Sequence, residues 1–194
     1  GDTFSLNAFV GERDTKRGFV PAPMIEGGLY IDSVGGGVSQ FATTLYNAVF
    51  FAGLKDIEHH PHSYYISRYP AGREATVSFP NPNLIFQNDT PTAILIQTSY
   101  TGTSLTVTFW GTKYYDVTST SSARYAFTTA GTRYNTRSDC EPAAGGQGFQ
   151  IDVTQTLSKN GVVVQKNVLH TRYDAEPVII CGPAPSVSPS PSPT

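Results

Sequence analysis

The chain has 194 residues, of which only 14% are charged, and its formal net charge is −2. An average soluble domain has about 25% charged residues, and the Thr, Ser, Asn, Gly and Tyr that replace them here are common in secreted β-rich proteins. The near-neutral charge gives no electrostatic case for nucleic acid or for an anionic membrane surface. No apolar run reaches the roughly 18–20 residues of a membrane span.

The length allows one domain or two small ones. No signal peptide is visible, and Gly1 is not a natural start. We therefore expect a fragment or a mature form cut from a longer protein. The oligomeric state stays open.

A glycine-rich turn leads into the clearest helix of the sequence. Gly35, Gly36 and Gly37 come first, and the apolar residues that follow recur at i, i+3 and i+4. This pattern predicts a helix over residues 40–52 with one buried face. Ser39 stands where an N-cap belongs, and Gly53 is a plausible C-terminal stop.

The glycine turn, residues 35–37, could carry chemistry. Glycines let the backbone approach a ligand closely. The first turn of a helix offers unpaired N–H groups that hold an anion or stabilise a developing oxyanion. Ser39 would be the nucleophile, although its hydroxyl needs a base within hydrogen-bond reach. In the alternative interpretation, Ser39 is an ordinary N-cap and the glycines form a tight turn.

Three histidines follow the helix within four positions: His59, His60 and His62. Metal binding, a catalytic or ligand-binding role, and a solvent-facing or packed role are all open, but no set of tetrahedral ligands is complete. We choose His62 because Pro61 fixes the backbone before it and residues 63–65 look like the start of a strand. A helix-start nucleophile followed by a strand histidine is also the chain order of papain-like cysteine hydrolases, by analogy only.

The segment 69–75 combines a Pro and Gly turn with Arg73 and Glu74 at the start of an expected strand. Arg73 could bind a carboxylate bidentately, or it could form an internal ion pair. A strand is expected at 75–79, before the turn-forming residues 80–83. Two further strands, 93–100 and 104–110, are predicted to form a hairpin around a Thr-Gly-Thr turn.

The chain divides near residues 111–115, and residues 112–183 are predicted to form strands and turns throughout. Period-two alternation over 148–157, the Asn160-Gly161 turn and the apolar run 162–169 predict a second hairpin. A last strand is expected at 177–181.

Two cysteines, Cys140 and Cys181, lie in this second part. Zinc is not expected, because neither has another Cys or a His at ligand spacing. A disulfide is the preferred interpretation, and two separate buried thiols are the alternative. Residues 184–194 alternate Pro and Ser. This pattern predicts an extended, solvated linker, and the alternative is a disordered terminus without a function. This tail favours an oxidising compartment, in which disulfides persist.

Several short segments, taken in order, resemble the VanW family over residues 1–111. They include a Phe-Ser-x-Asn opening, the glycine turn with Ser39 and Gln40, a His-Ser pair and a Gly-Arg-Glu-Ala run. The segments are 1–7, 11–14, 35–40, 43–48, 52–54, 62–63, 72–75 and 86–88. Residues 115–183 also resemble the small glycine-named β modules that often follow VanW domains in wall proteins.

The resemblance implies an extracellular or wall-associated bacterial protein that binds or remodels peptidoglycan, through a stem peptide or a glycan. No cofactor is implied. Some members of the family look like L,D-transpeptidases with a cysteine nucleophile in a Gly-Gly-Gly-x-Cys-Gln motif. By that match Ser39 stands at the nucleophile position and His62 at the base position. Ligand contacts are expected from Gly36, Gly37, Gln40, Thr43, Ser63, Arg73 and Glu74, the last standing where many relatives carry Asp.

Serine at the cysteine position weakens the case for catalysis, because a hydroxyl stays protonated near pH 7. Three explanations for Ser39 remain, in order of preference. It belongs to a non-catalytic, peptidoglycan-binding branch of the family, it is a working serine nucleophile, or it is an engineered replacement of a cysteine. The family takes its name from vancomycin-resistance gene clusters, which does not by itself establish a role in resistance.

The predicted fold is α+β. One main helix packs on antiparallel strands in residues 1–111, and residues 112–183 form a small all-β module closed by the disulfide. Three functions follow: a peptidoglycan-binding protein, an L,D-transpeptidase-like acyl transferase that uses Ser39 and His62, and a surface adhesion or spacer module.

Overall fold

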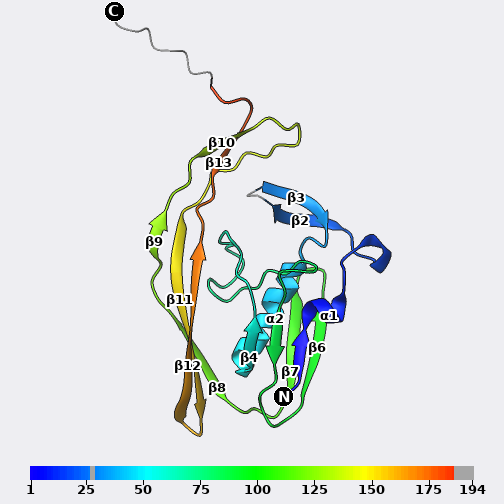
Figure 1. Cartoon of the computed structure of the whole chain (residues 1–194), viewed down its shortest axis with the longest axis vertical. Coiled ribbons are helices and arrows are strands. Elements are labelled where there is room, and N and C mark those ends of the chain that lie inside the picture. The colour runs from blue at the N-terminus through cyan, green and yellow to red at the C-terminus, as the bar shows by residue number, and fades with distance from the viewer. Residues whose placement is uncertain (27–28, 186–194) are drawn as a thin grey trace, which may run out of the picture.

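The computed structural model describes residues 1–26 and 29–185, so most of the predicted linker at 184–194 lies outside the described residues. The chain is a mixed α and β protein in which strands predominate (Figure 1). The elements are β1 (Thr3–Ser5), α1 (Leu6–Val10), the 3-10 helix η1 (Thr15–Arg17), β2 (Pro21–Glu26), β3 (Leu29–Val34), α2 (Val38–Ala52), β4 (Lys55–Glu58), β5 (Ile85–Gln87), β6 (Ile94–Tyr100), β7 (Leu105–Gly111), β8 (Asp116–Ser121), β9 (Tyr125–Thr128), β10 (Thr132–Asn135), β11 (Gly148–Lys159), β12 (Val162–Tyr173) and β13 (Val178–Cys181).

The helix α2 is the centre of the first part of the chain. Its predicted apolar face is buried, with Leu45, Tyr46 and Val49 each 1% exposed or less. Around it pack Leu6 of α1, Phe86 of β5 and the inward-facing residues of the β6–β7 hairpin. Gly53 ends the helix with a left-handed φ of +69°, as predicted. The main helix and its packing on strands are therefore confirmed.

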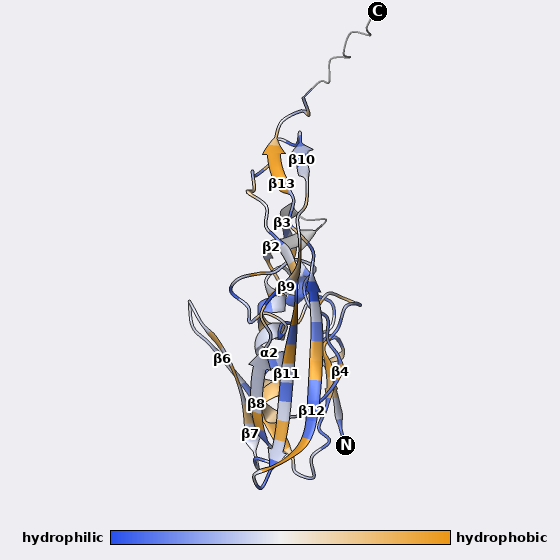
Figure 2. Cartoon of the chain, turned by 90° about the vertical axis from the view of Figure 1, so that its left-hand side faces the viewer, coloured by the Kyte–Doolittle hydropathy of each residue, from blue (hydrophilic) through white to orange (hydrophobic). Residues whose placement is uncertain are grey.

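The strands of the first part form three small antiparallel sheets. One has the order β1–β5–β4, and the others are the hairpins β2–β3 and β6–β7. The predicted hairpin at 93–110 is confirmed by the β6–β7 register, in which Ile94 pairs with Gly111. In Figure 2 the tip of this hairpin projects away from the rest of the molecule.

Three strand assignments between α2 and β5 are wrong. Residues 63–65, Arg73 with Glu74, and residues 75–79 all lie outside regular strands. The backbone N–H groups of 75–78 are satisfied individually instead: Thr76 donates to the carbonyl of His60 at 2.7 Å, and Ser78 to that of Pro82 at 2.9 Å, while those of Ala75 and Val77 reach side-chain hydroxyls. Because these partners are loop carbonyls and side chains, the extended segment joins no ladder.

The second part is built on a long antiparallel hairpin, β11–β12, with β8 along the other edge of β11. The predicted Asn160-Gly161 turn is confirmed, since both residues have positive φ, 52° and 77°. β12 runs to Tyr173, four residues beyond the predicted run. Farther along, β13 pairs in parallel with β10 (Figure 1).

This second part packs on the first. The Gln155 side chain of β11 donates a 2.6 Å hydrogen bond to the carbonyl of Phe50 in α2. Val117 of β8 and Leu157 of β11 lie close enough to Gly53 that a Cβ there would meet them at 3.1 and 3.4 Å. The β strands after residue 111 therefore cover the C-terminal end of α2.

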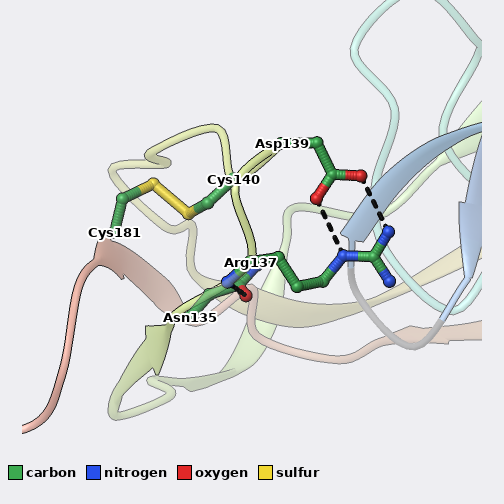
Figure 3. Close-up of a disulfide and its surroundings, with 5 residues drawn as sticks. All are labelled: Asn135, Arg137, Asp139, Cys140 and Cys181. Carbon is green, nitrogen blue, oxygen red and sulfur yellow. Dashed lines mark hydrogen bonds and ion pairs between the residues drawn. A yellow bond between two sulfur atoms is a disulfide. The ribbon is translucent and has the colours of Figure 1, made fainter.

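Cys140 and Cys181 form the predicted disulfide, with Cα atoms 5.7 Å apart (Figure 3). Beside it, Arg137 donates two hydrogen bonds to the carboxylate of Asp139, at 2.8 and 2.7 Å. These hydrogen bonds lower the pKa of Asp139 to about 2. The bridge closes the segment that carries β11 and β12.

Reducing the disulfide should destabilise the protein substantially. The bridge joins residues 41 positions apart, and closing a loop of that length stabilises the folded state by about 4 kcal/mol in the chain-entropy model. Urea unfolding followed with and without a reductant measures the difference. A Cys140→Ser, Cys181→Ser double variant should match the reduced protein and respond no further to reductant. Equal midpoints for oxidised and reduced protein would contradict the prediction.

Candidate functional site

The glycine turn joins β3 to α2. Gly35 and Gly37 have left-handed φ angles of +90° and +76°, which favour glycine. At Gly35 a Cβ would also lie 3.0 Å from the Cβ of Arg13. The turn thus brings the first residues of α2 close to the loop that carries Arg13.

Ser39 is not the N-cap that the sequence suggests. The N-cap is Gly37, two residues earlier, in a left-handed conformation. It makes no side-chain capping hydrogen bond, because glycine has no side chain. Ser39 lies within the first turn, and its hydroxyl accepts a 3.3 Å hydrogen bond from the backbone N–H of Val77. The ordinary capping interpretation of Ser39 is therefore wrong.

A cavity of about 560 Å³ opens at this end of α2. Four segments line it: the end of β3 with the glycine turn, the first turn of α2, residues of the 62–69 loop, and the extended segment 76–79, with Glu12 and Arg13 on a further side. Among the predicted site residues, Gly36, Gly37, Ser39, Gln40 and His62 all line this cavity. Residues far apart in the sequence thus meet in one concave site.

Asn7 holds one wall of the cavity in place. Its side-chain amide donates to the carbonyls of Ser78, Pro80 and Pro82, at 2.7, 2.8 and 3.2 Å. The backbone N–H of Asn7 in turn donates to the Asn83 side chain at 2.9 Å. The short helix α1 therefore fixes the loop that follows the extended segment.

His62 is held by a buried carboxylate. Its Nδ1 lies 2.7 Å from Oε2 of Glu74, which is 1% exposed. The imidazole also stacks on Tyr69, with 5.3 Å between ring centroids. When Glu74 is ionised, Nδ1 carries the proton and Nε2 is left as an acceptor. This pairing gives His62 the orientation that a general base requires.

Residues at the end of β12 form hydrogen bonds with the backbone next to His62 and Glu74. The hydroxyl of Tyr173, at the end of β12, accepts a 2.8 Å hydrogen bond from the backbone N–H of Gly72. Burial and then the nearby Glu74 carboxylate raise the pKa of Tyr173. The backbone N–H of Asp174 donates to the carbonyl of Ser63 at 2.7 Å. Strand β12 therefore anchors both ends of the loop that carries His62.

Four predicted ligand-binding residues do not line the cavity. Thr43 is buried and bonds the backbone of Ala75 through its hydroxyl. Glu74 is buried behind His62, and Ser63 faces a smaller hollow of about 160 Å³. The guanidinium of Arg73 lies over the rings of Phe50 and Phe51, 5.5 and 4.9 Å from their centroids. Their contacts within the described residues are structural.

Arg13 is a cavity residue that the motif analysis did not single out. It is 8% exposed, and none of its three guanidinium nitrogens has a hydrogen-bond partner among the described residues. Burial lowers the pKa of this arginine, although a guanidinium stays charged. The sequence offers one clue to Arg13: it lies in the Gly-Glu-Arg-Asp segment, which is rich in charge in a chain where charged residues are scarce.

The other two histidines have separate partners. His59 pairs with Asp56 and stacks on Tyr46, and His60 pairs with Glu58. Among the residues whose side chains the structure describes, 1–22 and 32–185, no three His, Cys, Asp or Glu side chains gather in a metal-binding arrangement. Over the same ranges, no helix has the length and hydropathy to cross a membrane.

Comparison with known proteins relates the first part of the chain to one family. The family model described as VanW like protein matches residues 1–110. The uncharacterized protein YoaR of Bacillus subtilis (strain 168) is 39% identical over 109 residues, which are 56% of this chain and 36% of the relative. The chain therefore spans little more than a third of that relative's length. No solved structure matches the chain.

Proposed function

The chain belongs to the VanW-like protein family, and we propose that it binds peptidoglycan stem peptides in the cavity between the glycine turn and His62. The cavity carries this proposal: at about 560 Å³ it has the size of a small-ligand site. Its polar groups converge from separate segments, and a buried carboxylate orients one of them. Three of the segments that carry the family resemblance, 11–14, 35–40 and 62–63, contribute residues to it.

The proposed location is extracellular, at the bacterial cell wall. The disulfide supports this location, because such bonds persist in oxidising compartments. The low content of charged residues and the predicted Pro/Ser linker agree with it.

The binding proposal predicts retention on insoluble peptidoglycan. Ser78→Trp should lower the affinity by roughly tenfold or more, about 1.4 kcal/mol, because the indole would fill part of the cavity. Ser78 lines the cavity, and its hydroxyl makes no hydrogen bond within the part of the chain that the structure describes. Co-sedimentation with purified sacculi measures the bound fraction.

The matched control is Thr103→Trp, which adds the same indole at the exposed β6–β7 turn. It should bind as the wild type does. Equal retention of Ser78→Trp would place binding outside the cavity. Absence of wild-type retention would refute peptidoglycan binding and favour an adhesion or spacer role.

A second candidate function is acyl transfer, which the His62–Glu74 pair specifically favours. In that reaction the hydroxyl of Ser39 gives its proton to His62 as its oxygen attacks a peptide carbonyl. The ester bond forms, the C–N bond breaks, and the leaving amine takes the proton from His62. An acceptor amine then attacks the ester and releases Ser39.

Mass spectrometry after incubation with stem peptides tests this candidate. A covalent adduct on Ser39, absent from Ser39→Ala, would support it. Retention on peptidoglycan without any adduct or cross-linked product would support the binding function and exclude acyl transfer by Ser39.

A further inference from the structure

Arg13 is a buried cation without an anionic partner among the described residues. Its side chain is 8% exposed, and Nε, Nη1 and Nη2 are all buried without a hydrogen bond. Placing an unpaired charge out of water is unfavourable, so buried charges are normally paired. An arginine that only stabilised the fold would be expected to use at least some of its five donors.

The fold places this cation on the cavity wall, against the glycine turn. Arg13 lines the cavity together with Gly35, Gly36 and Gly37. The absence of a side chain at Gly35 makes room for it, because a Cβ there would come within 3.0 Å of the Arg13 Cβ. The turn thus brings the guanidinium to the same cavity as the start of α2.

The start of α2 adds a second set of donors. The helix is 15 residues long, and its N-cap, Gly37, makes no side-chain capping hydrogen bond. The first N–H groups of a helix lack partners four residues back and carry a partial positive charge. The N–H of Gln40 donates to the carbonyl of Gly37 at 3.0 Å, so among the described residues the donors left at this end are those of Val38 and Ser39. Arg13 and this helix end therefore present two independent anion-binding groups to one cavity.

The charges of the cavity favour a singly charged anion. Two guanidinium groups, Arg13 and Arg68, and one carboxylate, Glu12, line it, which leaves one formal positive charge. A carboxylate neutralises that charge, and its two oxygens match the planar fork of a guanidinium. The two negative charges of a phosphate would exceed this single positive charge, and they would lie in the same cavity as the Glu12 carboxylate.

We propose that Arg13 and the start of α2 bind the free carboxylate of a peptide ligand. This inference rests on the proposed function, and it names the chemical group that the cavity selects: a stem peptide with a free terminal carboxylate over one whose end is amidated or cross-linked. Arg13 supplies two parallel charge-assisted hydrogen bonds, and α2 supplies backbone donors.

Calorimetric titration with a matched pair of peptides tests the selection. The probe is L-Ala-D-isoglutamine-L-Lys-D-Ala, whose terminal carboxylate is its only acid, and its partner is the same peptide with a C-terminal amide. The acid should bind roughly ten- to a hundredfold more tightly than the amide, because the amide cannot form the charge-assisted hydrogen bonds of a carboxylate. Binding of both peptides with equal affinity would overturn the inference and leave the proposed function standing.

Arg13→Met separates ligand recognition from folding. This variant should lose most of the preference for the acid, keeping only the part that the α2 donors supply. Its melting temperature without ligand should equal or exceed that of the wild type, because an unpaired buried charge is removed. Arg68→Met removes an exposed cavity cation and should keep most of the selectivity. A lower melting temperature for Arg13→Met would assign Arg13 to the fold and overturn the inference.

Small anions test the Arg13 site without peptidoglycan. At constant ionic strength, N-acetyl-D-alanine should raise the melting temperature of the wild type and raise that of Arg13→Met much less. That result in a protein that sacculi do not retain would support the Arg13 site and refute the proposed function. Stabilisation by inorganic phosphate in place of N-acetyl-D-alanine would overturn the carboxylate assignment, and no response to either ion or peptide would overturn both proposals.

Discussion

A Ser39→Cys variant should carry a thiol that reacts at unusually low pH. An exposed cysteine has a pKa of about 8.5, whereas thiols at helix N-termini or beside a histidine commonly titrate at about 3.5–7.5. Ser39 lies in the first turn of α2, and its oxygen accepts the N–H of Val77. The same N–H would stabilise a thiolate, so we expect the pKa of this thiol to fall by about one unit or more.

The pH dependence of alkylation by iodoacetamide measures this effect. A lowered pKa keeps the reactive thiolate at lower pH, so the midpoint of the rate profile should move below about 7.5. Thr103→Cys, on the exposed β6–β7 turn, is the matched control and should show a midpoint near 8.5. Adding His62→Gln to Ser39→Cys should move the midpoint back upward.

A midpoint for Ser39→Cys equal to that of Thr103→Cys would mean that the site activates no nucleophile. Acyl transfer by Ser39 would then have no physical basis, because a hydroxyl gains less than a thiol from the same surroundings. The binding proposal would be unaffected.

Replacing Tyr173 with alanine should cost about 3–5 kcal/mol of unfolding free energy, the range for large buried aromatic residues. Tyr173 is 1% exposed and packs on Phe149 and Tyr65, with ring centroids 4.9 and 5.4 Å away. Tyr173→Phe keeps this packing but leaves the buried N–H of Gly72 without its partner, which should cost about 1–3 kcal/mol.

Urea unfolding of both Tyr173 variants measures these costs. Tyr100→Ala is the control, because Tyr100 is 85% exposed and its removal should change the stability by less than about 0.5 kcal/mol. Tyr173→Ala should also weaken peptidoglycan binding, since β12 anchors the loop of His62. An unfolding curve of Tyr173→Ala that overlays that of Tyr100→Ala would show that this contact does not hold the two parts together.

Local patterns predicted the main helix α2 and the two long hairpins, β6–β7 and β11–β12. The i, i+3, i+4 spacing located α2, and alternation around Asn160 and Gly161 located the β11–β12 hairpin. Each of these signals comes from residues a few positions apart, so the sequence alone contains it. The family resemblance, not periodicity, paired Ser39 with His62, and both residues line one cavity.

The remaining features depend on contacts between distant residues. The segment 75–79 alternates like a strand, but its donors reach His60, Ser39 and Pro82. The bond between Tyr173 and Gly72 spans 101 positions. Arg73 resembled a ligand-binding arginine because motif spacing cannot show that two aromatic rings lie under its guanidinium.

The disulfide between Cys140 and Cys181 has a mechanical consequence. Tension applied to the chain beyond β13 reaches Cys181 first and crosses the sulfur–sulfur bond to Cys140. The intervening segment, which contains β11 and β12, is therefore spared the load. Stretched out, 41 residues would add roughly 140 Å of contour length. While the bridge is intact, that length cannot be drawn out, and β12, which anchors the His62 loop, is shielded from tension on the chain beyond Cys181.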